Sequence, residues 1–328
     1  MKSRDEFKSW FNYLPAIQFE EAALSLFRYQ SKHVQIYKDY LNQLKINPEA
    51  VKSLSDIPFL PIRFFKSHKV LSDDIVADLY FESSGTTSSV NSRHYFTNVE
   101  WYHQQSWKGF NQFFDKPEQY NILALLPSYA ERSNSSLISM VKFFMEQNSL
   151  VQHGFYLNDE KKLIDDLGNL SANGKQILLI GVSFALLQLA ENFATPLLNT
   201  LILETGGMKG RRKEITRFEL HAILKNSFQV KNIYSEYGMT ELFSQAWATS
   251  DGIFQPTRLM KVLAREINDP FKILPPNESG TLNIIDLANV DSCAFIATDD
   301  SGVVKEDGTF EVTGRIDESD LRGCNLMF

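Results

Sequence analysis

Residues 176–205 read QILLIGVSFALLQLAENFATPLLNTLILET, and this stretch decides the fold. The apolar runs 176–182 and 199–205 have the length and composition of buried β-strands, and residues 184–193 between them carry apolar side chains at helical spacing. Two strands joined by one helix lie parallel in the same sheet. The stretch therefore predicts an α/β fold in which helical crossovers join parallel strands.

The same alternation continues on both sides of this unit. After about residue 255 the pattern changes, because closely spaced turn signals separate the β-type runs TLNIID, CAFIAT and TFEVTG. We therefore expect mostly parallel sheets with helical crossovers, followed by a β-rich C-terminal part built from antiparallel hairpins. The further elements expected in the first part are strands at 75–81, 121–127, 199–205 and 230–236, and helices at 136–147 and 213–227.

The N-terminal residues differ from this core. Apolar positions at helical spacing predict two or three helices in 1–45, whereas Pro58 and Pro61 exclude a helix interior and indicate an extended linker. We expect residues 1–70 to form an N-terminal helical segment and linker within the main domain. Residues 71–328 would then form the core.

Composition limits the function. The 328 residues include 33 basic and 40 acidic side chains, and a net charge of −7 argues against nucleic acid as a partner. Two cysteines are too few for a disulfide framework, and the apolar runs are too short for a membrane span. With no signal peptide at the N-terminus, we expect a cytoplasmic protein without stable membrane insertion.

Two motifs offer chemistry at the ends of predicted strands. The hydroxyl-rich loop SSGTTSS (83–89) combines O–H and backbone N–H donors that suit phosphate oxygens, although such clusters are more often plain surface loops. The second motif, YSEYGMTE (234–241), ends in Glu241, a carboxylate that could hold Mg²⁺ on a nucleotide or merely decorate a helix. In the same motif, Tyr237 could stack on a base.

Weaker signals come from two further strand ends. Gly206 and Gly207 would let a flat ligand approach the backbone, or would form an ordinary turn. An aspartate of Thr298-Asp299-Asp300, with the arginine of Gly314-Arg315-Ile316-Asp317, suits ribose hydroxyls, although two charged hairpin tips would look the same.

Taken in order, these motifs resemble the adenylate-forming superfamily of acyl-CoA synthetases, adenylation domains and luciferase. The details look most like its acyl-protein synthetase (LuxE-type) branch, the ATP-dependent component of a fatty-acid reductase complex. The stretches that carry this closer resemblance are IPFLP (57–61), FKSH (65–68), LPSY (126–129) with Glu131-Arg132, GGMKGRR (206–212) and LRGCN (321–325).

The resemblance implies the large N-terminal-type domain of adenylate-forming enzymes, binding ATP and Mg²⁺. Glu241 would be the metal ligand and, with Arg93 and Cys324, a catalytic residue. Asp317 matches the superfamily's hinge residue. Only eleven residues follow it, so we expect the small C-terminal lid domain to be absent. The nucleotide-binding residues implied are Ser83, Ser84, Gly85, Thr86, Thr87, Gly206, Gly207, Tyr237, Gly238, Thr240, Asp299 and Arg315.

The expected reaction is ATP-dependent activation of a carboxylic acid, of the fatty-acid class, as an acyl-adenylate. Transfer to Cys324, beside the cationic Arg322, would follow, because a nearby cation favours the thiolate. A buried, inert cysteine is the alternative. Coenzyme A, a carrier protein or a reductase subunit could instead accept the acyl group, and a non-catalytic nucleotide-binding or acyl-binding protein is a second possibility.

Overall fold

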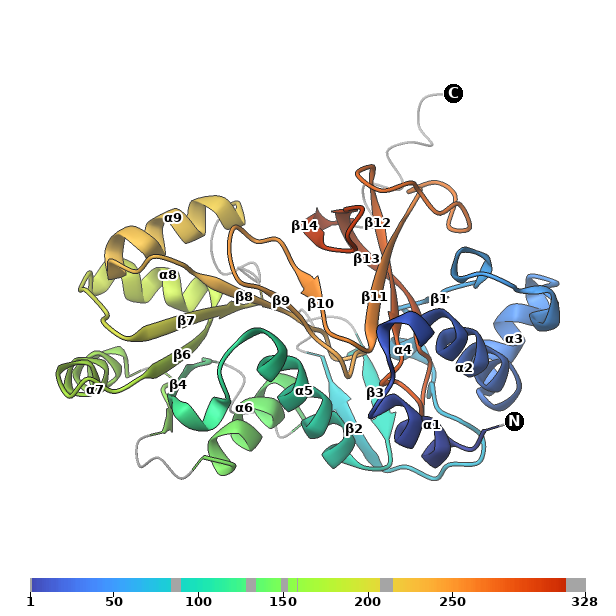
Figure 1. The fold of residues 1–328 in the computed structure, drawn as a ribbon, viewed down its shortest axis with the longest axis horizontal. Coiled ribbons are helices and arrows are strands. Elements are labelled where there is room, and N and C mark those ends of the chain that lie inside the picture. Colours follow the sequence, from blue (N-terminus) through green and yellow to red (C-terminus); the bar gives the residue numbers. More distant parts are fainter. Residues whose placement is uncertain are drawn as a thin grey trace. The chain divides into compact units, whose positions relative to one another are not determined.

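The computed structural model describes residues 2–83, 90–127, 134–148, 153–157, 159–206 and 215–316 (Figure 1). The chain forms two compact units that are not consecutive in sequence. Unit 1 comprises Met1–Tyr102, Thr240–Ser244 and Gln255–Phe328, and unit 2 comprises His103–Met239 and Gln245–Phe254. Short 3-10 helices occur at Ala16–Gln18, Pro48–Ala50, Leu54–Asp56 and Pro117–Gln119.

Unit 2 contains the predicted parallel sheet. Its strands lie in the order β9-β8-β7-β6-β4-β5, and neighbouring strands are parallel except for the antiparallel β8–β9 pair. Every residue of β4 and β6 is buried, which explains their continuous apolar sequences. The strands are β4 (Asn121–Leu125), β5 (Gly154–Phe155), β6 (Ile177–Val182), β7 (Thr200–Thr205), β8 (Tyr234–Tyr237) and β9 (Ala246–Ala248).

The helices of unit 2 begin where the sequence offers capping groups. The Ser135 side chain accepts the Ile138 N–H at the start of α6, and Thr216 and Glu219 form a reciprocal capping box on α9. The predicted helices at 136–147, 184–193 and 213–227 are confirmed within a few residues. The helices are α5 (Val99–Phe113), whose first residues belong to unit 1, α6 (Ser136–Glu146), α7 (Glu160–Ala172), α8 (Ser183–Asn192) and α9 (Arg217–Phe228).

Unit 1 contains the predicted antiparallel part. Its sheet has the order β1-β13-β12-β11, with β14 also pairing with β13. The C-terminal hairpins are thus confirmed, and the proline-containing linker is extended and pairs in parallel with β13. The strands are β1 (Leu60–Pro61), β2 (Leu79–Glu82), β3 (Arg93–Phe96), β10 (Gln255–Pro256), β11 (Met260–Arg265), β12 (Ser279–Asp286), β13 (Phe295–Val304) and β14 (Phe310–Arg315).

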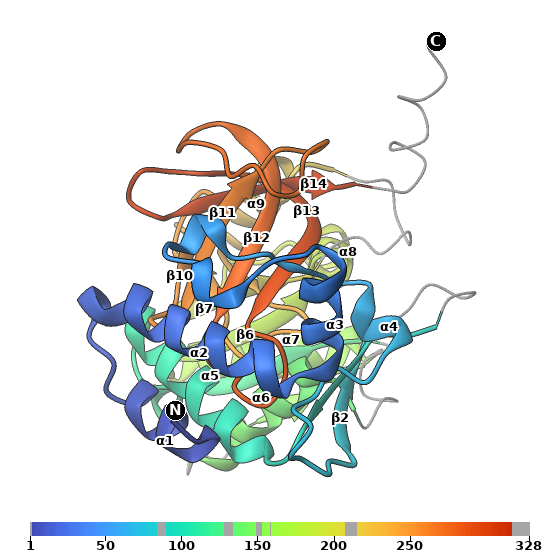
Figure 2. The same ribbon diagram turned by 90° about the vertical axis from the view of Figure 1, so that its right-hand side faces the viewer.

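Two or three N-terminal helices were expected, and three are present, of which α2 and α3 lie beside this sheet (Figure 2). Phe295 on β13 is the common contact of these two helices, since its ring lies 5.7 Å from Phe27 and 6.2 Å from Tyr37. Aromatic contacts of this kind join the helices to the sheet in one apolar core. The helices of this unit are α1 (Arg4–Phe11), α2 (Phe19–His33), α3 (Gln35–Gln43) and α4 (Phe64–Ser67).

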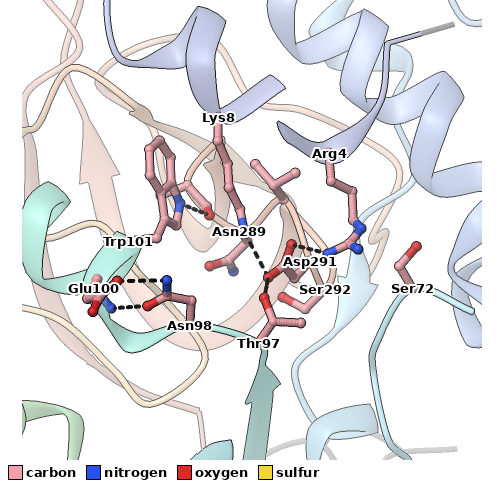
Figure 3. Close-up of polar contacts among 12 residues, drawn as sticks. Arg4, Lys8, Ser72, Thr97, Asn98, Glu100, Trp101, Asn289, Asp291 and Ser292 are labelled. Carbon is pink, nitrogen blue, oxygen red and sulfur yellow. Dashed lines mark hydrogen bonds and ion pairs between the residues drawn. The ribbon is translucent and has the colours of Figure 1, made fainter. Parts of the chain in front are cut away.

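Helix α1 is held by a buried acidic residue of the segment between β12 and β13 (Figure 3). The Asp291 carboxylate accepts from Lys8 Nζ at 2.9 Å, Arg4 Nη1 at 3.2 Å and Thr97 Oγ1 at 2.8 Å. Burial alone would raise the pKa of Asp291, but these cations and the Thr97 hydroxyl outweigh burial and lower it. A single carboxylate thus ties the first helix to the body of unit 1.

One predicted strand has a different place. The run 75–81 was expected in the parallel sheet, but only its last residues form β2, which pairs antiparallel with β3. That expectation is wrong because β2 and β3 pair antiparallel and only residues 83–92 lie between them in the chain. A parallel crossover needs a dozen or more residues, usually with a helix.

Candidate active site

The base of the hydroxyl-rich loop is fixed by backbone and side-chain bonds. Past the ends of β2 and β3, the Ser83 N–H donates to the Ser92 carbonyl at 3.0 Å, and the Ser92 N–H donates to Ser83 Oγ at 2.9 Å. The predicted site residues Ser84, Gly85, Thr86 and Thr87 lie outside the described residues. The paired residues Ser83 and Ser92 are called the base of this loop below.

Glu241 lies at this base. Its side chain is buried, and the Ser92 hydroxyl approaches its carboxyl group. Burial raises the pKa of Glu241, and the Ser92 hydroxyl and the charge of Arg315 oppose that rise. No helix follows Glu241 within residues 242–316, so the capping alternative does not apply there. The structure thus brings together Ser83, Glu241 and Ser92, a residue that the sequence analysis missed.

The segment Thr240–Ser244 is held rigidly in unit 1. The buried Asp286 carboxylate accepts the N–H groups of Phe243 and Ser244 at 2.7 and 2.8 Å, and also the Ser244 hydroxyl. Asn289 Nδ2 donates to the Glu241 carbonyl at 2.8 Å. These bonds fix the backbone at Glu241 and directly after it, an arrangement that suits a ligand-binding carboxylate.

The two aspartates after Thr298 have different partners. Asp300 lies opposite Arg315 in the β13–β14 register, and the Arg315 Nε to Asp300 Oδ1 distance is 3.9 Å. Asp299, the residue chosen from the sequence, instead lies 3.5 Å from Arg63 Nε. The structure therefore brings Asp300 rather than Asp299 to Arg315. Successive strand residues face opposite sides, so this difference of one position decides which side chain reaches the arginine.

Arg93 lies on β3, directly after the loop. Its Nε donates to Glu82 Oε1 at 2.8 Å, and its guanidinium lies 4.9 Å from the centre of the Tyr80 ring. This cross-strand pair is half-exposed. In this conformation the charge of Arg93 is matched by Glu82 on the surface of the hairpin.

Unit 2 contains the other predicted nucleotide-binding residues. Gly206, directly after β7, has φ +74°, a left-handed conformation that favours glycine, and its carbonyl accepts from Ser183 Oγ at 2.8 Å. The Tyr237 ring packs 5.7 Å from that of Phe254. A side chain at Gly238 would collide with the Glu236 carboxyl group, which explains the glycine there. Gly207 lies outside the described residues.

The carboxyl end of this parallel sheet also contains a buried glutamate, Glu204, and a partly buried one, Glu236. Thr205 Oγ1 donates to Glu236 Oε2 at 2.5 Å, and burial, together with the negative charge of Glu204, raises the pKa of Glu236 to about 7. The Glu204 side chain points to the other face of the sheet from Thr205, the next residue of β7, and His221 and Arg217 approach it there. The sequence offered no reason to choose either residue, although Glu236 belongs to the motif YSEYGMTE.

The cysteines are distinguished by burial. Cys293 is fully buried, and burial raises the pKa of its thiol to about 12, so it stays protonated and inert at neutral pH. Cys324 and Asp317 lie outside the described residues. Within the part of the chain that the structure covers, no three His, Cys, Asp or Glu side chains form a metal-binding cluster.

Among the described helices, none combines the length and the apolar character that crossing a bilayer requires.

The fold is that of adenylate-forming enzymes. ATP-bound MatB from Rhodopseudomonas palustris superimposes with a TM-score of 0.55 at 17% identity, covering 74% of this chain and 49% of its own. The thioesterification-state structure of 2-hydroxyisobutyryl-CoA ligase, in complex with 2-HIB-AMP and CoA, gives 0.69 at 12% identity, covering 94% and 71%. The chain thus spans about half the length of the MatB structure.

Sequence comparison gives the family. The acyl-protein synthetase (LuxE) family model matches residues 16–328. The long-chain-fatty-acid–luciferin-component ligase of Vibrio harveyi is 25% identical over 334 aligned residues, covering 92% of this chain and 84% of that protein. The chain belongs to the LuxE acyl-protein synthetase family and is therefore an ATP-dependent ligase, as the sequence motifs predicted.

Proposed function

We propose that this protein uses ATP to activate a carboxylic acid of the fatty-acid class and then transfers the acyl group to a protein cysteine. The observation that carries the proposal is the buried Glu241 carboxyl group beside Ser92, whose N–H donates to Ser83 at the base of the hydroxyl-rich loop. Family membership and the fatty-acid ligase from Vibrio harveyi support the choice of acid.

In the first step, a carboxylate oxygen of the acid attacks the α-phosphorus of ATP. The bond from this phosphorus to the bridging oxygen breaks, and pyrophosphate leaves with the electron pair. Hydroxyl and backbone donors of residues 83–87 would stabilise the charge that develops on the phosphate oxygens. Glu241 fits a Mg²⁺ site, because Mg²⁺ takes one or two carboxylates together with phosphate oxygens, and a bound Mg²⁺ would neutralise phosphate charge.

The remaining nucleotide contacts are assigned by geometry or by resemblance. We assign the ribose hydroxyls to Asp300 and Arg315, which the structure places side by side. Contacts of adenine with Gly206, Gly207 and Tyr237 stay predictions, as does a phosphate contact of Arg93, whose side chain would first have to leave Glu82.

In the second step, a cysteine thiolate attacks the acyl carbonyl carbon, and the bond to the AMP oxygen breaks. The burial of Cys293 excludes it as the acceptor in the folded protein, which supports Cys324 among the cysteines of this chain. The product is a thioester, and AMP leaves. Docking to a reductase subunit would follow from the family resemblance.

Pyrophosphate exchange over a panel of carboxylic acids tests the first step. We expect exchange that depends on Mg²⁺ and is fastest with a fatty acid. A folded protein that exchanges with no acid of the panel would contradict the proposal.

Labelling tests the second step. We expect Cys324→Ser to keep exchange and lose a hydroxylamine-sensitive acyl label, while the matched Cys293→Ala variant keeps both. A label that persists in Cys324→Ser would assign the acceptor elsewhere.

The family membership favours a protein acceptor over coenzyme A, and product analysis with and without coenzyme A checks that preference.

A further inference from the structure

A buried histidine connects the hydroxyl-rich loop to the segment that carries Glu241. His94 is the second residue of β3, the strand that leaves the loop, and its side chain is 1% exposed. Its ring packs 4.6 Å from that of Phe243 and 5.6 Å from that of Phe65. Within this apolar surround, both ring nitrogens have polar partners.

The partners decide which nitrogen carries the proton. Nδ1 lies 3.1 Å from the Thr240 carbonyl oxygen, which can only accept, so Nδ1 donates. Nε2 lies 2.6 Å from Ser292 Oγ. Burial lowers the pKa of His94 to about 4, although the Thr240 bond and the charge of Asp291 oppose this effect. At neutral pH the ring is therefore uncharged, and Nε2 accepts from the Ser292 hydroxyl.

The chain around His94 contacts the segment Thr240–Ser244 through polar and aromatic groups. The Ser92 hydroxyl approaches the Glu241 carboxyl group, and two residues later the His94 ring bonds to the Thr240 carbonyl and packs against Phe243. Asp286 and Asn289 hold the backbone that follows, but Asp286 comes from the end of β12 and Asn289 from the segment between β12 and β13. His94 is thus the side chain through which the strand leaving the loop holds the backbone directly before Glu241.

We propose that His94 is a positioning residue for the nucleotide site: its Nδ1–H···O=C bond sets the place of Thr240 and Glu241 relative to the base of the hydroxyl-rich loop. The inference rests on the proposed function. His94 contacts neither the nucleotide nor the acid, so it acts through Thr240 and Glu241. A hydrogen bond is short-range and directional. An apolar side chain of similar size could therefore fill the space of the His94 ring without replacing its hydrogen bond to Thr240.

Two amide substitutions separate the bond from the bulk of the ring. In His94→Asn the amide nitrogen takes the place of Nδ1 and can donate to the Thr240 carbonyl. In His94→Gln the amide takes the place of Nε2, keeps the contact with Ser292 and loses the bond to Thr240. His33→Gln, on α2, is the control, because His33 stacks on Tyr29 at 4.5 Å in the same unit.

The experiment measures pyrophosphate exchange per folded molecule while the Mg²⁺ concentration is varied, with the folded fraction taken from thermal unfolding. We expect His94→Gln to lower kcat about tenfold and to raise the Mg²⁺ concentration for half-maximal rate, since a directional buried bond is lost. The KM for the acid should not change. His94→Asn should stay within about threefold of the wild-type rate, and His33→Gln should match the wild type.

Equal rates for the Asn and Gln variants, after correction for folding, would overturn the inference. If the wild type exchanges with no acid, the proposed function fails, and calorimetry of Mg²⁺·ATP binding to the same proteins then decides the role of His94. Weaker binding in His94→Gln alone supports positioning, and equal binding in all four proteins contradicts it.

Discussion

Replacing Asp291 by Asn should destabilise unit 1 by about 2–3 kcal/mol. The carboxylate is 6% exposed and accepts charge-assisted bonds from Lys8 and Arg4, and a third bond from Thr97 (Figure 3). Breaking a fully buried ion pair costs roughly 3–5 kcal/mol. Lys8 and Arg4 are 16% and 23% exposed, so both can regain some water, and the Asn oxygen still accepts one bond. These effects place the expected loss below that range.

Urea unfolding followed by tryptophan fluorescence measures the loss, and amide hydrogen exchange in α1 localises it. The matched control is Asp74→Asn, because Asp74 binds the same Arg4 at 3.4 Å but is 53% exposed. Exposed pairs contribute about 0–1 kcal/mol, so this variant should lose little. If both variants lose the same stability, or if exchange quickens outside α1 but not in it, then burial of Asp291 does not anchor the helix.

Three further outcomes are expected. The free energy of unfolding should fall as pH drops from 6.5 towards 4, and His94 should contribute up to about 3 kcal/mol of that loss. The reason is that His94 is protonated below about pH 6.5 in the unfolded chain but only below about pH 4 in the folded protein. In acid-unfolding curves, His94→Asn should remove this contribution to the slope. The pH dependence that Glu236 contributes has the opposite sign, because its pKa is raised to about 7 in the folded protein and stability is lost as pH rises from 4.5 through 7. Glu236→Gln should therefore raise the Tm at pH 8.5 and leave it unchanged at pH 4.5. Asp300→Asn should lower kcat/KM for ATP about tenfold in the exchange assay, while Asp299→Asn changes it less; the reverse order would return the ribose contact to Asp299.

The sequence predicted the parallel sheet because its strands are buried on both faces. The runs at 121–127 and 176–182 are apolar after their first residue, and β4 and β6 are indeed buried at every residue. The run at 75–81 is also mostly apolar, but strand character does not specify a partner. Pairing of β2 with β3 depends on the short connection between them, and the second strand, Arg93–Phe96, has the mixed composition RHYF, which gives no strong strand signal.

For the candidate site, the motifs pointed to Glu241, but the residues that hold its backbone in place left no pattern. Ser92, Asp286 and Asn289 come from separate parts of the chain and converge on one backbone segment through tertiary contacts. A single sequence shows no such convergence, because each residue alone has the composition of an ordinary turn or strand end. Positions that act through the backbone of another residue are found only when the fold is known.

The proposed ribose pair shows the limit most sharply, because both aspartates belong to the same motif. Adjacent strand residues point to opposite faces, so choosing between Asp299 and Asp300 requires the register with the partner strand. That register is set by the pairing of Asp300 with Arg315, and it shifts between Ser301 and Gly302, where the strand pairing is irregular. A one-residue irregularity leaves no signature in composition or periodicity. The motif therefore predicts an acidic side chain at this strand end, whereas only the hydrogen-bonded ladder can assign it to one residue.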